Sequence, residues 1–180
     1  MPQKTRAFHQ SLYFRAVAHL MLIAAVVAAV PAFMASRSAM QIAERGVAER
    51  AAVVSDFIAV EAGGALKFGK SDALVDLFQK AIDTSDSAAL GALAMTGNGD
   101  ELAPVGDVPE ALRSLAAQAL ETGASATSAN GFQIAQPVVF GRENAVVGVI
   151  AMNWSPAKAL DEVAADQMNM LLVSLATFLA

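Results

Sequence analysis

The chain has no cysteine and only two histidines among its 180 residues. Without thiols it can form neither a disulfide framework nor a thiolate metal site. His9 and His19 both precede residue 36, so the rest of the chain lacks the usual general base at neutral pH and the commonest metal ligand. We therefore expect no enzyme, no metal site and no cofactor.

Other chemical motifs are also missing. No glycine-rich phosphate loop occurs, and "GNGDE", with Asp100 and Glu101, falls short of a calcium loop, which needs acidic ligands at alternate positions. Carboxylate pairs do occur, but a solvated surface explains them: Asp72 with Asp76, and Asp161 with Glu162. The function is thus expected to be one of binding.

Charge is distributed unevenly along the chain. Residues 1–15 carry +3 with no acidic residue, whereas residues 37–168 carry nine Lys/Arg and seventeen Asp/Glu. An acidic body offers no basic face, which argues against a nucleic-acid partner. A basic tip is typical of the cytoplasmic flank of a membrane helix.

The apolar content of 56% and the mean hydropathy of +0.48 exceed those of an ordinary soluble domain and indicate membrane segments.

The first candidate membrane segment is "AVAHLMLIAAVVAAVPAFMA", twenty residues from Ala16 without a formal charge. That length suits a spanning helix. We therefore expect a cytoplasmic tail over residues 1–15 and a first transmembrane helix over 16–36. The alternative is a cleaved signal peptide, with Ser36 and Ser38 as the small residues at a cleavage site. On either interpretation, the chain after residue 36 lies outside the cytoplasm.

A long amphipathic helix is predicted next, as a stalk. Apolar residues recur in steps of three and four, an eleven-residue repeat close to a straight helix: Met40, Ala43, Val47, Ala51, Val54, Ile58, Ala62 and Ala65. The small side chains favour close packing, and we predict a homodimer with a seam at Met40, Val47 and Val54. The alternative is that this stripe covers the chain's own domain. Gly63 and Gly64 are expected to end or bend the helix.

Alternating short elements follow the stalk. "SDALVDLFQKAID" predicts a helix capped by Ser71, and "VPEALRSLAAQALET" a second, with Pro109 near its start and Gly123 closing it. Two hairpins are predicted. "AALGALAMT" and "ELAPV" flank "GNGD", with Pro104 marking an edge strand, and "FQIAQPVVFG" and "AVVGVIAMNW" flank a turn at "RENA".

A last helix opens at Ser155-Pro156 and continues into "NMLLVSLATFLA". From Met170 the apolar run reaches only about 16 Å, and a bilayer core is about 30 Å thick. We interpret residues 167–180 as the start of a second transmembrane helix that is truncated at Ala180. A short C-terminal anchor is the alternative.

Two stretches resemble a known family. "LGALAMTGNGDELAPVG" and "QPVVFGRENAVVGVIAMNWS" are similar to the two hairpins of the single-Cache, PAS-like sensor region of bacterial methyl-accepting chemotaxis proteins and related receptors. The resemblance covers Leu90 to Ser155. It implies an α+β fold with an N-terminal membrane helix, a stalk helix, a PAS-like antiparallel sheet with helices on one side, and the start of a second membrane helix.

The resemblance also implies a function. Residues 37–166 would form a periplasmic sensor domain, anchored in the bacterial inner membrane, that passes a conformational signal through the second membrane helix. Its partners would be the membrane, a second copy, a small-molecule ligand and cytoplasmic signalling proteins reached through a missing C-terminal part. The alternatives are the sensor of a histidine kinase or nucleotide cyclase, and a non-signalling envelope scaffold.

A ligand site is expected at inward strand positions and on the covering helix. The candidates are Phe78, Phe132, Phe140, Arg142, Met152 and Trp154. Arg142 and Arg113 are the cations available to an anionic ligand. Core packing is the alternative role for the aromatic residues, and a solvated surface for the arginines. The Arg-x-Trp-Tyr cluster that amino-acid-binding members of the family usually carry has no counterpart here.

Membrane topology provides the first test. Because only the flank before residue 16 is basic, we expect residue 100 to lie outside the cytoplasm. The chain has no cysteine, so an Asp100→Cys variant carries one thiol. A membrane-impermeant maleimide that passes the outer envelope should label it in intact cells. Labelling only after lysis would contradict this topology.

Overall fold

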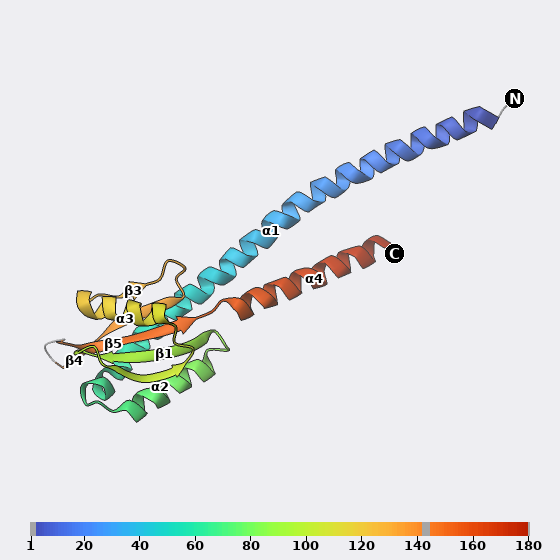
Figure 1. The fold of residues 1–180 in the computed structure, drawn as a ribbon. Helices are drawn as coiled ribbons and strands as arrows, with labels where there is room; N and C mark the ends of the chain where they lie inside the picture. The colour runs from blue at the N-terminus through green and yellow to red at the C-terminus, as the bar shows by residue number, and fades with distance from the viewer. Residues whose placement is uncertain (1–2, 142–144, 180) are drawn as a thin grey trace. The chain divides into compact units, whose positions relative to one another are not determined.

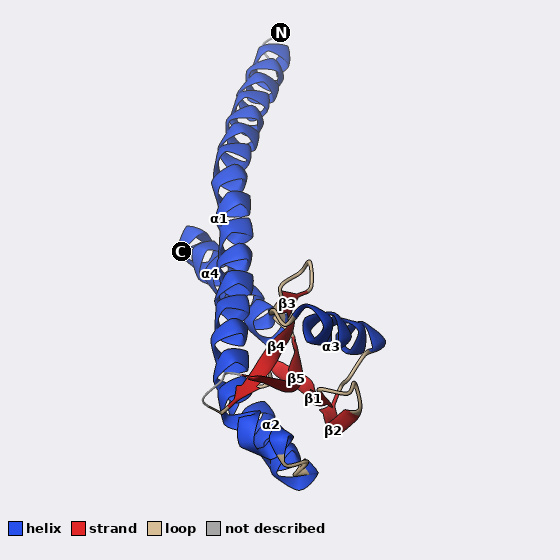
Figure 2. Cartoon of the chain, turned by 90° about the vertical axis from the view of Figure 1, so that its left-hand side faces the viewer, coloured by secondary structure: helices blue, strands red, loops and turns tan. Residues whose placement is uncertain are grey.

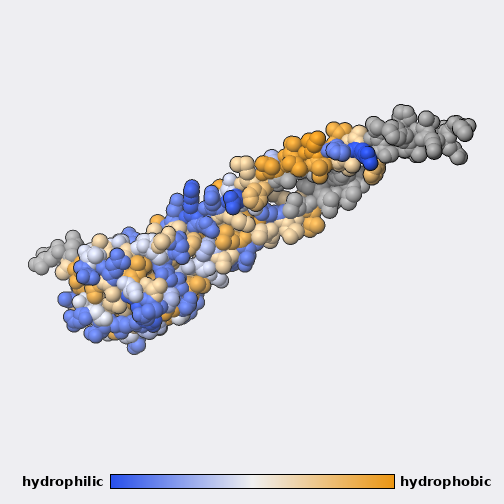
Figure 3. Space-filling view, turned by 45° about the horizontal axis from the view of Figure 1, so that its top comes forward, coloured by the Kyte–Doolittle hydropathy of each residue, from blue (hydrophilic) through white to orange (hydrophobic). Residues whose placement is uncertain are grey.

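The computed structural model describes residues 3–141 and 145–179, which form two compact units that meet between Gln41 and Ile42. The described residues of the first unit are helical and belong to α1, Gln3–Lys67. Large apolar side chains are exposed along this unit: Leu20, Met21, Leu22, Ile23, Val26, Val27, Val30, Phe33 and Met34. Figure 3 shows apolar atoms gathered on the helix next to the grey N-terminal residues. A search of the described residues finds no helix with the length and apolarity needed to cross a membrane.

The second unit is built on a five-stranded antiparallel sheet (Figure 1). Its strands are β1 (Ala89–Thr96), β2 (Glu101–Gly106), β3 (Ala126–Thr127), β4 (Gln133–Phe140) and β5 (Ala145–Trp154), in the order β2-β1-β5-β4-β3. Both predicted hairpins are present, and Pro104 lies on an edge strand as predicted. The predicted turn at "RENA" falls mostly on residues 142–144, outside the described residues. The two-residue β3 was not predicted.

Each face of the sheet packs against helices. Along β1 and β5, residues alternate between two hydrophobic cores. Ala92, Ala94, Ile150 and Met152 pack with α1 and α2 (Ser71–Thr84), whereas Leu93, Met95, Val149 and Ala151 pack with α3 (Glu110–Thr122). The period of two follows from the strand pleat. The predicted α+β class is thus confirmed. The helices α1 and α2 cover one face of the sheet, as predicted, and α3 forms an additional layer on the opposite face (Figure 2).

The prediction that Gly63 and Gly64 end the stalk helix is wrong. The helix α1 continues to Lys67 and is followed by Gly69 with φ +61°. A Cβ placed on Gly63 would lie 3.1 Å from the carbonyl oxygen of Val139. Gly63 therefore lets α1 approach β4 closely, and Gly69 supplies the left-handed conformation that favours glycine after a helix.

The other helix ends agree with the sequence, apart from one cap. Gly123 closes α3 in the left-handed conformation, φ 64°, with its N–H donating to Ala119 O. α4 spans Ala157–Leu179, and the Ala157 N–H donates to Ser155 Oγ at 3.2 Å. Ser71 is not the cap of α2: the cap position is Lys70, and no side chain caps this end.

Candidate functional site

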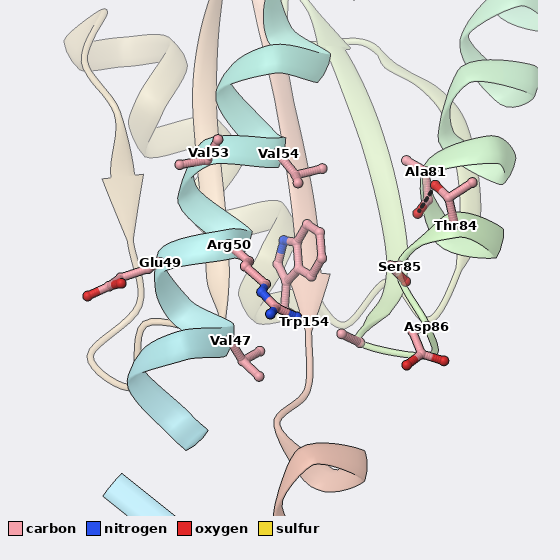
Figure 4. Close-up of a pocket in the computed structure, with 11 residues that line it drawn as sticks. Val47, Glu49, Arg50, Val53, Val54, Ala81, Thr84, Ser85, Asp86 and Trp154 are labelled. Carbon is pink, nitrogen blue, oxygen red and sulfur yellow. Dashed lines mark hydrogen bonds between the residues drawn. The ribbon is translucent and has the colours of Figure 1, made fainter. Parts of the chain in front are cut away.

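A pocket of about 460 Å³ lies between α1, the turn after α2 and the end of β5. We call it the Trp154 pocket, because the indole of Trp154 lies between its two walls (Figure 4). One wall is formed by α1, and the residues that line the pocket there are Val47, Glu49, Arg50, Val53 and Val54. The opposite wall comes from Ala81, Thr84, Ser85, Asp86 and Ala88. The pocket thus lies where the sheet passes into α4.

The hydroxyl groups in this wall are already hydrogen-bonded. Thr84 Oγ1 donates to the Lys80 carbonyl at 2.7 Å. Ser85 Oγ donates to the Ile82 carbonyl at 2.7 Å and accepts from the Ala89 N–H at 2.9 Å. These bonds close the end of α2 and fix the turn into β1, and they leave the hydroxyls little capacity for an incoming group.

The turn from α2 to β1 is unusual and is tied to α4. Asp86 and Ser87 have φ of 56° and 65°, the left-handed region that non-glycine residues seldom occupy. The Asp86 carboxylate pairs with Lys158 at the start of α4. This hydrogen bond raises the pKa of the Lys158 ammonium. The Ser155 N–H also donates to the Ala88 carbonyl at 2.7 Å.

Arg50 is the cation in the pocket wall, and it has no ion-pair partner among the described residues. Figure 4 shows its side chain directed towards Trp154, whereas Glu49 points away from the indole. Trp154 is only 5% exposed, and its Nε1 finds no hydrogen-bond acceptor in the described part of the chain. The pocket therefore combines an apolar floor with a free guanidinium.

Of the five predicted ligand residues that the structure describes, Trp154 alone lines this pocket. Phe78 and Met152 are fully buried in the core shared with α1, and Phe132 packs against that core. Phe140 is 40% exposed and meets Phe68 edge to face. Arg142 lies outside the described residues.

The other predicted cation, Arg113, is engaged elsewhere. Its Nε donates to Glu101 at 2.8 Å and its Nη1 to the Val108 carbonyl at 2.9 Å. The hydrogen bond to Glu101 raises the pKa of Arg113. Within the described residues, no cluster of His, Cys, Asp or Glu could hold a metal ion.

The predicted dimer seam is largely covered by the chain itself. Val47 is only 9% exposed, and Val54 packs against the core beneath α1. Met40 keeps 37% of its surface exposed. The alternative, that the stripe covers its own domain, therefore holds for Val47 and Val54.

A second apolar stripe on α1 is exposed instead. We call it the outer stripe; it comprises Ile42, Val53, Phe57 and Val60, which are 70%, 71%, 56% and 70% exposed. Its spacing is also helical, but the sequence of a helix with two apolar stripes does not show which one faces the sheet. Val53 also lines the Trp154 pocket at its α1 side.

Comparisons with protein-family models, curated proteins and solved structures find no match to this chain. A function must therefore be inferred from the chain's own residues and geometry.

The Trp154 side chain provides a test of the pocket floor. Trp154→Phe removes an N–H that lacks an acceptor, so we expect the free energy of unfolding to fall by less than about 1.5 kcal/mol. Trp154→Ala removes the whole indole and should lower the free energy of unfolding by about 3–5 kcal/mol. Urea unfolding followed by circular dichroism measures both. If Trp154→Phe lowered the free energy of unfolding as much as Trp154→Ala does, the indole N–H would have to make a stabilising hydrogen bond.

Proposed function

We propose that the chain is the extracytoplasmic sensory module of a bacterial transmembrane signal transducer, of the single-Cache, PAS-like kind found in methyl-accepting chemotaxis receptors. One observation carries the proposal. β5 is the central strand, hydrogen-bonded to both β1 and β4, and only Ser155 and Pro156 separate it from α4. A shift of the sheet would reach α4 directly, without any intermediate element.

Placement in the inner membrane is the second part of the proposal. It rests on the twenty uncharged residues from Ala16 and on the basic residues before them. Exposed apolar side chains surround α1 in this region, and they continue on α4 at Met168, Met170 and Leu172. A helix that is apolar on all sides is typical of a membrane span or a buried core. The body from residue 37 to residue 166 would then lie in the periplasm.

A homodimer is the third part of the proposal, with a revised interface. The outer stripe lies on the side of α1 that points away from the residues packed on the sheet, Ala51, Ile58 and Ala62. Two copies of α1 that pack along Ile42, Val53, Phe57 and Val60 would cover these side chains. Contact between the stalks would also bring the two sets of membrane helices together, as a two-copy receptor requires.

The join between β5 and α4 is the place to test the signalling function. Residues 1–180 can be fused to the cytoplasmic part of an established chemoreceptor and screened for kinase responses to small molecules. Two glycines inserted between Ser155 and Pro156 should abolish the response, since the slack would absorb the motion of the strand. Thermal unfolding of the same chimera should be nearly unchanged, because the insertion lies in a loop.

Two results would contradict the proposal. A chimera that folds and reaches the membrane but answers no compound would argue against a sensory role. A normal response in the folded insertion variant would mean that the signal travels through α1 instead. Two alanines inserted after Gly99, in the β1–β2 turn, make the matched control and should leave the response intact.

Cross-linking tests the revised dimer interface. In an Ile42→Cys variant, oxidation should join two copies, and adding Val53→Asp should lower the yield about fivefold or more, because two unpaired charges would be buried together. Ala52→Asp, one position off the stripe, is the control and should have little effect. Efficient cross-linking of Met40→Cys but not of Ile42→Cys would favour the seam predicted from the sequence.

A further inference from the structure

The charge in the Trp154 pocket points to the kind of ligand that it accepts. Arg50 is unpaired in the described part of the chain and faces the indole (Figure 4). Of the two carboxylates in the lining, Asp86 is neutralised by Lys158 and Glu49 points away. The pocket therefore offers one positive charge, and no unpaired carboxylate in its lining faces inward to meet an ammonium group. An anion fits this balance, whereas a cation or a zwitterionic amino acid does not.

The rest of the lining selects an apolar body. Val47, Val54, Ala88 and the indole of Trp154 supply apolar surface, and the nearby hydroxyls are already hydrogen-bonded. A polyol or sugar would find few partners there. The volume of about 460 Å³ lies within the range of small-molecule pockets, roughly 300–1,000 Å³. A flat ring could stack on the indole, since aromatic rings prefer offset or edge contacts.

The pocket also borders the groups that hold the start of α4. Its wall includes Asp86 and Ala88, which bond to Lys158 and to the Ser155 N–H. Trp154 itself is the last residue of β5. A bound molecule would thus contact the turn and the strand end that together anchor α4.

From these observations we infer that the Trp154 pocket binds a small aromatic monocarboxylate, with its carboxylate on Arg50 and its ring against Trp154. That this molecule acts as the stimulus rests on the sensory function proposed above, whereas its binding does not.

Binding is tested on the full chain in lipid vesicles, which add no other protein, with benzoate as the probe. Trp154 is the only tryptophan, so emission excited at the red edge reports on this site alone. Benzoate should change the emission saturably and raise the unfolding temperature. Benzamide, the neutral isostere, and benzylamine, the cation, should do neither. Arg50→Gln should weaken benzoate binding about tenfold or more, because a charge-assisted bond is lost.

Two further variants make the test specific. Arg45→Gln removes a matched exposed arginine, outside the pocket and five residues earlier on α1, and should leave binding unchanged. Ala88→Leu fills the pocket without changing its charge and should also abolish binding. No saturable response to benzoate, equal affinity for benzamide, or equal losses in Arg50→Gln and Arg45→Gln would each overturn the inference.

The signalling chimera separates this inference from the proposed function. If benzoate binds through Arg50 but produces no kinase response, the site stands and the sensory proposal loses support. If the chimera responds to other compounds and benzoate does not bind, the ligand class is wrong while the sensory function stands.

Discussion

The structure depends on the position of β5 at the centre of the sheet. Its backbone is hydrogen-bonded along both sides, to β1 and β4, and its side chains enter both cores in alternation. Neither helical layer can move against the sheet without disturbing this strand. Since interiors are close-packed and tend to repack in discrete steps, a displacement of β5 would be a shift of a whole layer, and not a local adjustment.

The cores on either side of this strand are built largely from alanine. Ala51, Ala62, Ala92, Ala94, Ala116, Ala119, Ala135 and Ala151 are all completely buried. Each alanine contributes little apolar area, so the stability of these cores depends on the close approach of backbones more than on the burial of large side chains. This composition also explains the open pocket beside Trp154, because Ala81 and Ala88 do not reach across to α1.

The sequence predicts the order of elements well, because each one carries a local signal. The β-rich run "AVVGVIAMNW" predicts β5 with its observed bounds, and Gly123 marks the end of α3. The prediction for Gly63 was wrong because glycine occurs both where a helix ends and where a helix packs closely on a strand, and the sequence alone does not distinguish these two roles. Two-residue β3 carries no pattern at all, since its pairing with β4 is decided by tertiary contacts.

The candidate site was predicted only in part, for a related reason. Trp154 was predicted because inward positions on the strands were expected to line the site. Arg50 was not, since a charged residue on an amphipathic helix is normally solvated, and only the tertiary fold directs its side chain towards the indole. Likewise, a repeat of three and four residues shows that α1 has apolar stripes, but the choice between the inner and outer stripe is made by the sheet.

The edges of the sheet have a consequence for how copies of the chain can associate. An open edge strand is a template for pairing with another chain, and such pairing leads to aggregation. Here one edge is β3, only two residues long, and the other is β2, where Pro104 removes an N–H and Ala103 at φ 51° interrupts the ladder. The addition of a strand from another chain is therefore disfavoured at both edges of the sheet. Many copies of this domain can then associate through their helices while each sheet stays separate.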